Sequence, residues 1–298
     1  MRITSLPDAE SRPRAVAVGT FDGVHLGHRR VIGGADTVLT FDPHPVSVVA
    51  PEHTPKLLTT LDQKAELIAG LGVQELVVIP FTREIASRSA REFIDDVLVG
   101  TLEATRVAVG ENFRFGHKAQ GTPALLAEET RFATVVHPLL EVEGEVVSSS
   151  HIRGLVAAGE VAKAERFLGA PFELRGEVVR GEQRGRQLGF PTANLVPDER
   201  LVLPGHGVYA CLAGTAAGEL AEAGAAAVSI GVRPTFGTGR GELIEAYLLD
   251  FEGDLYGREL RLHFLHRLRG ERRFDTVEAL VQQMHGDVTR TRELVGER

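Results

Sequence analysis

The sequence contains a single cysteine, Cys211, among 298 residues, so no disulfide can form within the chain. This composition suits a reducing compartment, and we expect a cytoplasmic protein. Cys211 follows Tyr209 and Ala210 in a strand-like run, which predicts a buried thiol without a chemical role. The segment from Met1 to Asp8 lacks the apolar stretch of a secretory signal, so none is expected.

Long apolar runs are also missing, because no segment approaches the roughly 18 continuous apolar residues that a membrane-spanning helix needs. We therefore expect no membrane partner. Lysine and arginine number 33 against 41 aspartates and glutamates, which gives a net charge of −8. The chain thus lacks an overall basic field, and we expect no nucleic-acid partner, although a local cationic site for a small phosphorylated ligand is compatible with this charge. No internal repeat is found, and the sequence leaves the oligomeric state open.

Hydrophobic residues make up 43% of the chain, enough for packed cores, and the length corresponds to about two domains. The first half contains five short apolar runs with helical segments between several of them, at residues 14–19, 37–41, 76–80, 106–110 and 133–136. Strands that alternate with helices predict a doubly wound parallel α/β sheet. Capping boxes at Thr60–Gln63 and Ser89–Glu92 predict helices that end near Gly70 or Gly72 and near Gly100.

The pattern changes after about residue 168, where short strands follow one another with glycine-rich turns between them. The predicted strands are 174–180, 207–212, 226–230, 243–249 and 259–264. Strands without intervening helices predict an antiparallel β-barrel. A closing helix is predicted from Asp275, with Glu278 as its capping partner. Its apolar side is expected to carry Val277, Leu280, Val281 and Met284.

We accordingly predict two domains, residues 1–168 and 169–298, with the boundary near 169–171. The first is expected to be an α/β domain and the second a β-barrel with a closing helix. An Ala/Gly-rich stretch at residues 212–227 is expected to form a variable loop with strand edges.

The motif from Gly19 to His28 reads Gly-Thr-Phe-Asp-Gly-Val-His-Leu-Gly-His and joins a predicted strand to a predicted helix. His25 and His28 are three residues apart, so they share one face of the helix. Gly27 leaves room for a phosphate, and the helix start offers free N–H groups and partial positive charge. This arrangement suits ATP when a nucleophile attacks its α-phosphate. The alternative is a pair of solvated histidines behind a glycine turn, but the complete strand, loop and helix favour nucleotide binding.

Three further segments accompany this motif, Thr40-Phe41-Asp42-Pro43-His44-Pro45, Gly110-Glu111-Asn112-Phe113-Arg114-Phe115-Gly116 and Ser148-Ser149-Ser150-His151-Ile152-Arg153. Together they resemble the nucleotidyltransferase superfamily with the His-x-Gly-His motif. More narrowly, they are similar to the adenylyltransferase half of the bacterial bifunctional riboflavin kinase/FAD synthetases. Ser150 stands where that family has threonine, and this change keeps the hydroxyl.

The resemblance implies ATP contacts for Gly19, Phe21, His25, His28, Ser149, Ser150 and Arg153. It also implies that His28 and Asn112 act at the reacting phosphate, and that Asp42, His44 and Arg114 contact the flavin. For His44, a turn role between two prolines is an equal alternative. Taken out of context, Ser150 would be an N-cap and Arg153 a solvated helix charge.

One segment departs from the family, because residues 29–39 are shorter than its usual helix and loop. The run Ile32-Gly33-Gly34-Ala35 is expected to end the first helix after about two turns. The seventeen residues from Thr20 to Asp36 still exceed the roughly 10–12 that a βαβ crossover needs, so the fold can close. The departure bears on helix packing and on the rate of adenylyl transfer.

The second motif runs from Gly185 to Asn194 and ends in Gly-Phe-Pro-Thr-Ala-Asn. In an extended segment Thr192 and Asn194 face the same way, and both are hard oxygen ligands suited to Mg²⁺ with nucleotide phosphates. Gly185 and Gly189 allow close backbone approach. Glu245, on a later predicted strand, is a candidate to accept the proton of a substrate hydroxyl that attacks a γ-phosphate. Taken alone, Glu245 would be an exposed strand residue.

This motif, together with residues 207–209, 229–236 and 245–257, resembles the riboflavin kinase domain. The resemblance implies that Thr192 and Asn194 hold Mg²⁺ and phosphate, that Gly185 and Gly189 lie at the ATP and that Glu245 is catalytic. The whole chain is thus expected to phosphorylate riboflavin to FMN and then to adenylylate FMN to FAD, with ATP and Mg²⁺ at both steps. Two alternatives stay open: a kinase whose adenylyltransferase is slow or inactive, and a flavin- or nucleotide-binding regulatory protein without turnover.

Overall fold

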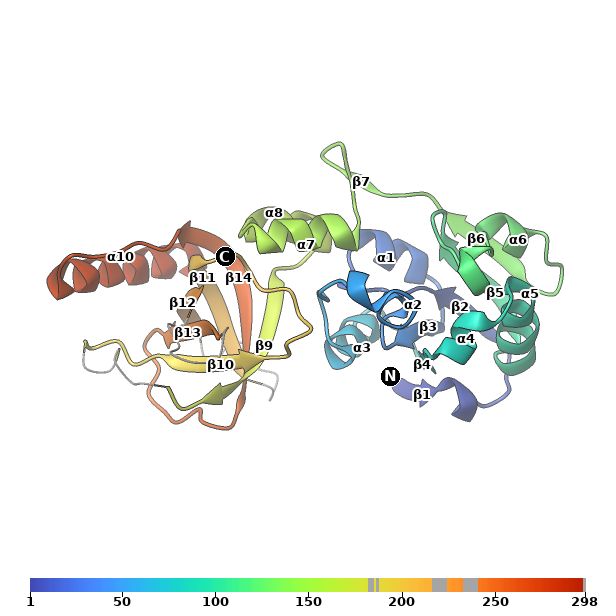
Figure 1. Cartoon of the computed structure of the whole chain (residues 1–298), viewed down its shortest axis with the longest axis horizontal. Helices are drawn as coiled ribbons and strands as arrows, with labels where there is room; N and C mark the ends of the chain where they lie inside the picture. Colours follow the sequence, from blue (N-terminus) through green and yellow to red (C-terminus); the bar gives the residue numbers. More distant parts are fainter. Residues whose placement is uncertain (182–184, 186–187, 216–223, 233–240, 297–298) are drawn as a thin grey trace. The chain divides into compact units, whose positions relative to one another are not determined.

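The computed structural model describes residues 1–181, 185, 188–215, 224–232 and 241–296 (Figure 1). The chain forms two compact units, Met1–His151 and Ile152–Arg298. The predicted boundary near residue 169 lies later, after a helix, α8 (Val161–Leu168), that packs on the strands of the second unit. The apolar side of α8 explains this attachment, because Val161, Ala164 and Phe167 are buried there.

The first unit is built on a six-stranded sheet in the order β1-β4-β3-β2-β5-β6. The strands are β1 (Arg2–Ser5), β2 (Arg14–Val18), β3 (Thr37–Asp42), β4 (Glu75–Pro80), β5 (Ala104–Gly110) and β6 (Ala133–His137). All neighbouring strands run parallel, and the five predicted strands are confirmed. The edge strand β1 was not predicted; it pairs with β4.

Helices cover both faces of this sheet. They include α1 (Leu26–Ile32), α2 (Pro45–Val49), α3 (Leu61–Ala69), α4 (Arg83–Ser87), α5 (Ala90–Glu92), the π-helix η3 (Phe93–Thr101) and α6 (Pro123–Ala127). Short 3-10 turns lie at η1 (Leu6–Asp8), η2 (Pro51–His53) and η4 (His117–Ala119), and β7 (Glu141–Val142) pairs with β8 (Glu145–Val146). Both predicted capping boxes are present. The first helix ends at Gly70 as predicted, and the second continues as η3 and ends at Thr101, one residue past its predicted stop at Gly100.

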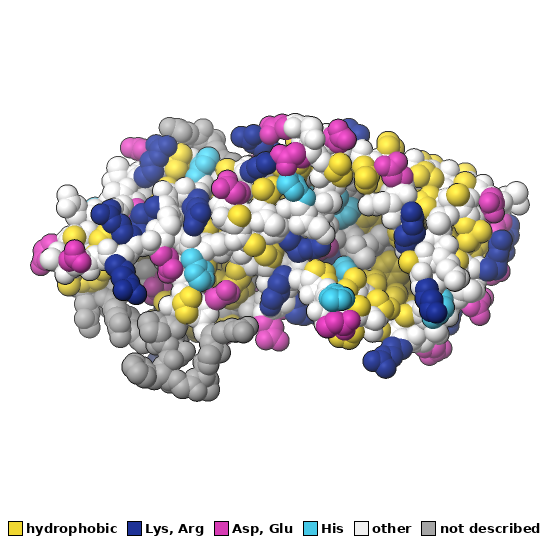
Figure 2. Space-filling view, turned by 45° about the horizontal axis from the view of Figure 1, so that its top comes forward, with side chains coloured by type: hydrophobic (Ala, Val, Ile, Leu, Met, Phe, Trp, Pro, Cys, Tyr) yellow, Lys and Arg dark blue, Asp and Glu magenta, His cyan; other side chains and the backbone are white. Residues whose placement is uncertain are grey.

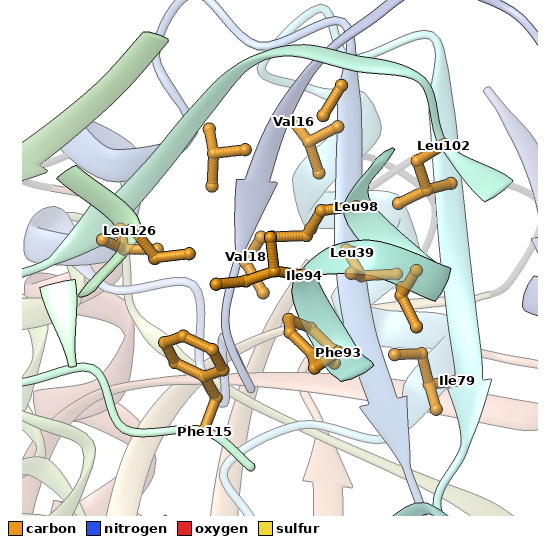
Figure 3. Packing of buried hydrophobic residues seen from close by; sticks show 14 of the residues in the cluster. Val16, Val18, Leu39, Ile79, Phe93, Ile94, Leu98, Leu102, Phe115 and Leu126 are labelled. Atoms are coloured by element: carbon orange, nitrogen blue, oxygen red, sulfur yellow. The ribbon is translucent and has the colours of Figure 1, made fainter. Parts of the chain in front are cut away.

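The two faces of the sheet form separate cores, because successive strand residues point to opposite sides. One core packs α1 and α3 on the sheet and contains Ala17, Phe21, Val24, Val31, Ile32, Val38, Ala65, Ile68, Val73, Leu76 and Ala108. The other packs η3 and α6 on the opposite face, and Figure 3 shows its centre, with Val16, Val18, Leu39, Ile79, Phe93, Ile94, Leu98, Leu102, Phe115 and Leu126. Helices on both faces of a parallel sheet confirm the doubly wound fold.

The strand order places the first site. From β2 the chain proceeds to β3 and β4 on one side, and β5 and β6 lie on the other side. Ligands of open parallel sheets bind at such a switch point, outside the carboxyl ends of the strands. The loop that follows β2 carries the Gly19–His28 motif, and the loop that follows β5 carries Asn112. The two predicted segments therefore flank the switch point.

The second unit is a closed antiparallel barrel in the order β10-β13-β12-β11-β14-β9. Its strands are β9 (Phe172–Val179), β10 (Ala193–Pro197), β11 (Gly207–Thr215), β12 (Gly224–Val232), β13 (Glu242–Leu248) and β14 (Glu259–Arg269). The five predicted strands are confirmed, and β10 adds a sixth that closes the barrel between β9 and β13. Cys211 is fully buried, and burial raises the pKa of its thiol well above the ordinary value, as expected of a core cysteine.

Two further helices belong to this unit, the greater part of α7 (Ser149–Ala157) and the terminal α10 (Val277–Gly296). The predicted start of α10 was wrong, because Thr276 rather than Asp275 caps it, accepting the N–H of Ala279 at 3.2 Å. Val277 is 56% exposed and lies off the packed side. The other three predicted residues, Leu280, Val281 and Met284, are half-buried, and the fully buried residues of the helix are Asp287 and Thr291. Much of the predicted variable loop, residues 216–223, lies outside the described residues, and its flanks belong to β11 and β12.

Candidate active sites

The loop after β2 has a strained backbone that is fixed from several directions. Phe21 and Val24 have positive φ angles of 49° and 40°, a conformation that side-chain-bearing residues seldom adopt. The buried carboxylate of Asp22 accepts the N–H groups of Leu58 at 2.9 Å and Thr59 at 3.2 Å. The loop is therefore tied to the segment that precedes α3, and its shape is set before any ligand binds.

The two histidines of the motif form a stacked pair. His25 is the N-cap of α1, and its Nδ1 accepts the N–H of His28 at 3.2 Å. The two rings lie 3.5 Å apart with an interplanar angle of 16°. A Cβ on Gly27 would lie 3.2 Å from the ring of His25, so the glycine leaves room for this ring as well as for a ligand.

The ring of His28 packs against Phe21, and one of its two ring nitrogens makes no hydrogen bond in the described part of the chain. Phe21 is buried and meets His28 edge-on, with ring centroids 5.3 Å apart, so Phe21 supports the histidine from inside the core. Nδ1 of His28 is buried without a hydrogen-bond partner in the described part of the chain. Burial, followed by the charges of His25 and Lys64, lowers the pKa of His28 well below its ordinary value. The imidazole is thus neutral near pH 7 until an anion approaches.

The predicted triphosphate residues on α7 start beside this loop. The hydroxyl of Ser149 donates to the backbone carbonyl of Asp22 at 2.9 Å. Ser148, not Ser150, caps the helix, because its hydroxyl accepts the N–H of His151 at 3.2 Å. Ser150 is exposed, and Arg153 is half-buried and belongs to the second unit. The capping alternative for Ser150 is therefore excluded.

The remaining predicted residues of the first unit follow the carboxyl ends of β3 and β5. Asn112 and Arg114 are exposed in the loop that follows β5. Asp42 ends β3, and the bond from Asp42 to Pro43 is cis. Nδ1 of His44 accepts the N–H of Val46 at 3.2 Å and caps α2, which gives His44 a turn role, and its contact with the flavin stays a prediction.

Sequence reasoning missed two residues near this loop. Asp22 lies within the motif, but only the structure shows that its carboxylate anchors the loop. Lys64 on α3 is 8% exposed, which is rare for a lysine. The available signal was its position between Gln63 and Ala65, on the side of α3 that faces the core.

In the barrel, the structure brings together three predicted residues, Asn194 on β10, Glu245 on β13 and Thr192 just before β10. Asn194 on β10 is directly paired with Glu245 on β13, so their side chains share a face. Thr192 lies two residues before Asn194, and its hydroxyl donates to Oε1 of Glu245 at 3.4 Å. Glu245 is half-buried rather than fully exposed, and its neighbours Ile244 and Ala246 point into the barrel core. The three polar side chains therefore form one cluster on the outside of the barrel.

Glycines let backbone approach this cluster closely. A Cβ on Gly185 would lie 2.4 Å from the carbonyl oxygen of Phe190 and 3.4 Å from Oγ1 of Thr192. Similarly, a Cβ on Gly181 would lie 2.4 Å from the amide nitrogen of Asn194. Gly181 and Gly185 thus lie against the two predicted metal ligands, whereas open space surrounds Gly189, and the approach of this segment to ATP stays a prediction.

An aromatic group adjoins the polar cluster. Phe190 is buried, and its ring contacts Tyr247 of β13 at 5.2 Å and His285 of α10 at 5.0 Å between centroids. Arg269 anchors α10 through a two-pronged ion pair with Asp287, with distances of 3.0 and 2.8 Å to Oδ2. The closing helix therefore contributes side chains beside the Pro-Thr-Ala-Asn motif, which sequence reasoning had not assigned to it.

The donor set fits a magnesium ion carried by a nucleotide. Thr192, Asn194 and Glu245 offer hydroxyl, amide and carboxylate oxygens, the hard ligands that Mg²⁺ uses together with phosphates. A cage of three or more His, Cys, Asp or Glu side chains does not occur within the described ranges.

The molecular surface mixes charges of both signs. On the face shown in Figure 2, lysine and arginine side chains are interspersed with aspartate and glutamate over most of the surface. Among the residues that the structure describes, no helix is long and apolar enough to cross a membrane.

Comparisons with known proteins match both halves of the chain. The FAD synthetase family profile matches residues 8–151, and the riboflavin kinase profile matches residues 168–295. Bifunctional riboflavin kinase/FMN adenylyltransferases of Listeria monocytogenes and Escherichia coli (strain K12) are each 36% identical to the chain. The matches cover 94% of this chain and 91% of the Listeria protein, and 99% and 96% for Escherichia coli.

A solved structure shares the fold over nearly the full length. It is described as a macrolide-efflux protein from Streptococcus pneumoniae and is 30% identical, with a TM-score of 0.89 that covers 98% of this chain and 99% of that chain. A doubly wound domain followed by a kinase barrel defines a two-domain, ATP-using transferase. Given the extent of the matches, the chain belongs to the bifunctional riboflavin kinase/FMN adenylyltransferase family. It carries both a riboflavin kinase domain and an FAD synthetase domain.

Proposed function

We propose that the barrel phosphorylates riboflavin to FMN and that the α/β unit adenylylates FMN to FAD, each step using one ATP. The observation that carries the kinase half is the hydrogen bond from Thr192 to Glu245 beside Asn194. The adenylyltransferase half is supported by the stacked pair of His25 and His28 at the switch point of the sheet. Family membership supports both assignments.

In the kinase step, Glu245 would accept the proton of the terminal hydroxyl of riboflavin as its oxygen attacks the γ-phosphorus of ATP. The bond from the γ-phosphorus to the bridging oxygen breaks, and ADP leaves. A carboxylate suits this task because proton removal at the right point contributes substantially to catalysis. The glycine segment around Gly185 and Gly189 would lie along the ATP phosphates.

Thr192 and Asn194 would hold Mg²⁺ together with the phosphates, where the ion would neutralise negative charge. The hydroxyl of Thr192 can point one lone pair at the metal while it donates to Glu245. Glu245 would therefore be oriented by a residue that also faces the nucleotide. The aromatic group of Phe190, Tyr247 and His285 would provide an apolar edge beside these polar groups.

In the adenylyl step, a phosphate oxygen of FMN would attack the α-phosphorus of ATP, and pyrophosphate would leave. No covalent intermediate with the protein is needed, so the residues position the reactants and stabilise charge. His25, His28 and the hydroxyls of Ser149 and Ser150 would bind the triphosphate, joined by Arg153. Asn112 would contact the reacting phosphate, and Asp42 and Arg114 would lie toward the flavin.

The shortened first helix is compatible with this assignment. Helix α1 has seven residues and ends at Gly33, yet β3 still pairs with β2 in the parallel sheet. The stacked histidines lie at the N-cap and in the first turn, which the shortening leaves intact. We therefore favour an active adenylyltransferase over a kinase with a degenerate partner domain. The ligands of the bifunctional enzyme are riboflavin, FMN, FAD and ATP, and the use of ATP favours a cytoplasmic enzyme.

Chromatography of flavins after incubation of the purified protein with riboflavin, ATP and Mg²⁺ tests the proposal. We expect FMN to appear first and FAD to follow. Accumulation of FMN without FAD would show that only the kinase is active. The shortened segment at residues 29–36 would then be the expected cause of the missing adenylyltransferase activity. Unchanged riboflavin, with the protein shown to be folded, would favour a flavin-binding protein without turnover. Quenching of flavin fluorescence without a new product would identify that binder.

A further inference from the structure

Lys64 on α3 is a buried cation that the two proposed reactions leave without a role. The residue is 8% exposed, and its ammonium makes no hydrogen bond or ion pair with any residue that the structure describes. Burial of an ammonium group is unfavourable, because the charged form loses its hydration. Lysine is among the residues least often found inside a protein unless it is paired. The position therefore calls for a partner that carries negative charge.

The start of α3 is fixed against the loop that carries the two histidines. The carboxylate of Asp22 in this loop accepts the N–H groups of Leu58 and Thr59, immediately before the helix. The N–H of Gly23 donates to the hydroxyl of Thr59 at 3.1 Å. Lys64 follows five residues after Thr59 and is thus held close to the loop.

Packing on both sides of Lys64 strengthens this placement. Its neighbour Ala65 and, one turn later, Ile68 are buried in the same core as Phe21 and Val24 of the loop. Gln63, on the other side, is 1% exposed and completes the capping box of α3. The helix cannot turn Lys64 toward solvent without pulling these residues out of the core.

Several charged or titratable groups surround Lys64. Burial is the main influence and lowers the pKa of Lys64, while the charges of Asp22 and Asp42 raise it. The charge of Lys64 in turn lowers the pKa of His28. Lys64 is therefore electrostatically coupled to the proposed phosphate-binding histidine. The carboxylate of Asp22 also accepts the backbone N–H groups of Leu58 and Thr59.

We propose that the ammonium group of Lys64 binds phosphoryl oxygens of a ligand in the adenylyltransferase site, near His28. The inference rests on the proposed function of this unit and adds a substrate-binding residue to it. The ligand class is a phosphate group with at least two negative charges. Within the reaction, this group is either the pyrophosphate portion of ATP or the phosphate of FMN.

A purely structural role as counter-charge to Asp22 and Asp42 is the competing explanation, and it predicts the opposite effect on stability. A structural cation stabilises the empty protein, so its removal lowers the melting temperature. A buried cation whose partner is a ligand destabilises the folded protein when the site is empty. Its removal therefore leaves the melting temperature unchanged or raises it. The isosteric change Lys64→Met separates these two roles.

The experiment titrates inorganic pyrophosphate and, separately, FMN into the full-length protein and three variants by calorimetry. The variants are Lys64→Met, Lys64→Arg, which keeps the charge, and the control Lys118→Met, which removes an exposed lysine from the turn at residues 117–119. We expect Lys64→Met to weaken one of the two ligands at least about tenfold, the effect of losing one charged hydrogen bond. Lys64→Arg should retain part of the affinity, and Lys118→Met should match the wild-type protein.

Loss of pyrophosphate affinity alone would assign Lys64 to ATP, and loss of FMN affinity alone would assign it to the FMN phosphate. Unchanged affinity for both ligands would overturn the inference, as would a Lys64→Met variant that melts lower than the wild type or fails to fold. Formation of FAD from FMN by the wild-type protein is measured alongside. Absence of FAD there would contradict the proposed function of this unit, while the calorimetry would still decide whether Lys64 binds phosphate.

Discussion

The hydroxyl of Thr192 donates to Oε1 of Glu245 at 3.4 Å, across the pairing of β10 with β13. The bond joins a proposed metal ligand to the proposed catalytic base, and Asn194 lies directly opposite the same glutamate. Register in a sheet with one buried face is strongly specified, since a slip by one residue would turn these side chains inward. The barrel thus positions both halves of the kinase chemistry with one set of strand hydrogen bonds.

Glu245→Gln keeps the shape of the side chain and removes its ability to accept a proton from the substrate. We expect the rate of FMN formation to fall by at least about a hundredfold, the contribution of a positioned general base. FAD formation from supplied FMN should be unchanged, because the variant lies in the other unit. Glu242→Gln, at the exposed start of β13, is the matched control and should retain both activities. Equal loss of both activities in Glu245→Gln would contradict the assignment.

His28→Ala should have the reverse effect. Loss of one positioned donor from a charge-stabilising site costs about a hundredfold or more in rate, so FAD formation from FMN should fall by that factor. Phosphorylation of riboflavin should persist. His53→Ala, which removes an exposed histidine of the same unit, should leave both rates intact. Chromatographic assays of the two reactions on the same preparations check this, and normal FAD synthesis by His28→Ala would exclude the phosphate role of His28.

Pyrophosphate binding should be accompanied by proton uptake. In the empty site burial, then the charges of His25 and Lys64, lower the pKa of His28, so the ring is neutral near pH 7. A bound anion favours the charged imidazolium and raises this pKa, so the ring takes up a proton at pH values between the free and bound pKa. Calorimetry at pH 6 to 7 in two buffers of different ionisation enthalpy measures the uptake. His28→Gln should reduce it, and equal uptake by the variant would assign the proton to another group.

Local sequence signals determined much of the first unit. The apolar runs before Gly19 and Gly110 became β2 and β5, and the boxes at Thr60 and Ser89 cap their helices as predicted. These features depend on a few neighbouring residues. The switch point then follows from the strand order, which explains why the sequence motifs after β2 and β5 converge.

Features that depend on distant partners were not predictable in the same way. Strand β1 has only four residues, and its pairing with β4 makes it a strand. The helix from Ala90 ends at Thr101, next to the expected stop at Gly100, but its second part is an unpredicted π-helix, and Leu102 after it donates to Val97 at 3.0 Å. A Cβ on Gly100 would lie 3.0 Å from the carbonyl oxygen of Asp95, so the glycine fits inside this wider turn.

The same distinction, between features set by neighbouring residues and features set by distant packing, applies to the candidate site residues. Thr192, Asn194 and His28 were predicted as site residues because the motifs that carry them are local in the sequence. Lys64 was missed, since its burial depends on how α3 packs against the loop after β2. The part of the predicted second site at residues 186–187 lies outside the described residues.

Glu75→Gln should destabilise the first unit strongly. Glu75 is buried and receives hydrogen bonds from Thr4, from Arg12 and from Arg14, whose side chain is 0% exposed. Removal of the carboxylate leaves the Arg14 cation buried without its partner, which costs about 3 to 5 kcal/mol in the free energy of unfolding. Urea unfolding followed by circular dichroism and by loss of FAD formation measures the change. Glu10→Gln, at the exposed pair with Arg2, should change stability by less than about 1 kcal/mol.

The contribution of Glu75 should also depend on pH. Burial raises its pKa, but the hydrogen bonds from Thr4 and Arg12 and the charge of Arg14 outweigh burial and lower the pKa below 4.5. A lowered carboxyl pKa stabilises the folded protein above the unfolded pKa and loses this effect as pH falls through the folded value. The difference in stability between wild type and Glu75→Gln should therefore shrink as the pH falls from about 6 toward 3. A constant difference in stability over this range would mean that the charge of Glu75 does not account for its contribution to stability.

Gly116→Ala tests how the loop that carries Asn112 is held. Gly116 has a φ of 70°, and a Cβ there would lie 2.5 Å from the backbone nitrogen of Ala90, at the start of α5. Gly72 has a similar φ of 83°, but open space surrounds its position. Both alanine variants bear the left-handed backbone strain of about 1 to 2 kcal/mol, and only Gly116→Ala adds a steric clash with backbone.

We therefore expect Gly116→Ala to lose stability beyond Gly72→Ala by about 1 to 3 kcal/mol, the usual cost of overpacking. Because the clash must displace the loop or α5, FAD formation from FMN should fall in Gly116→Ala even where the protein stays folded. Gly72→Ala should keep its rate, since that turn lies between α3 and β4 at the opposite end of the strands from Asn112. Urea unfolding and the FAD assay on both variants measure the two effects. Equal stability of the two variants would mean that the loop adjusts to the added Cβ without loss of stability. The close contact of Gly116 with Ala90 would then have no part in positioning Asn112.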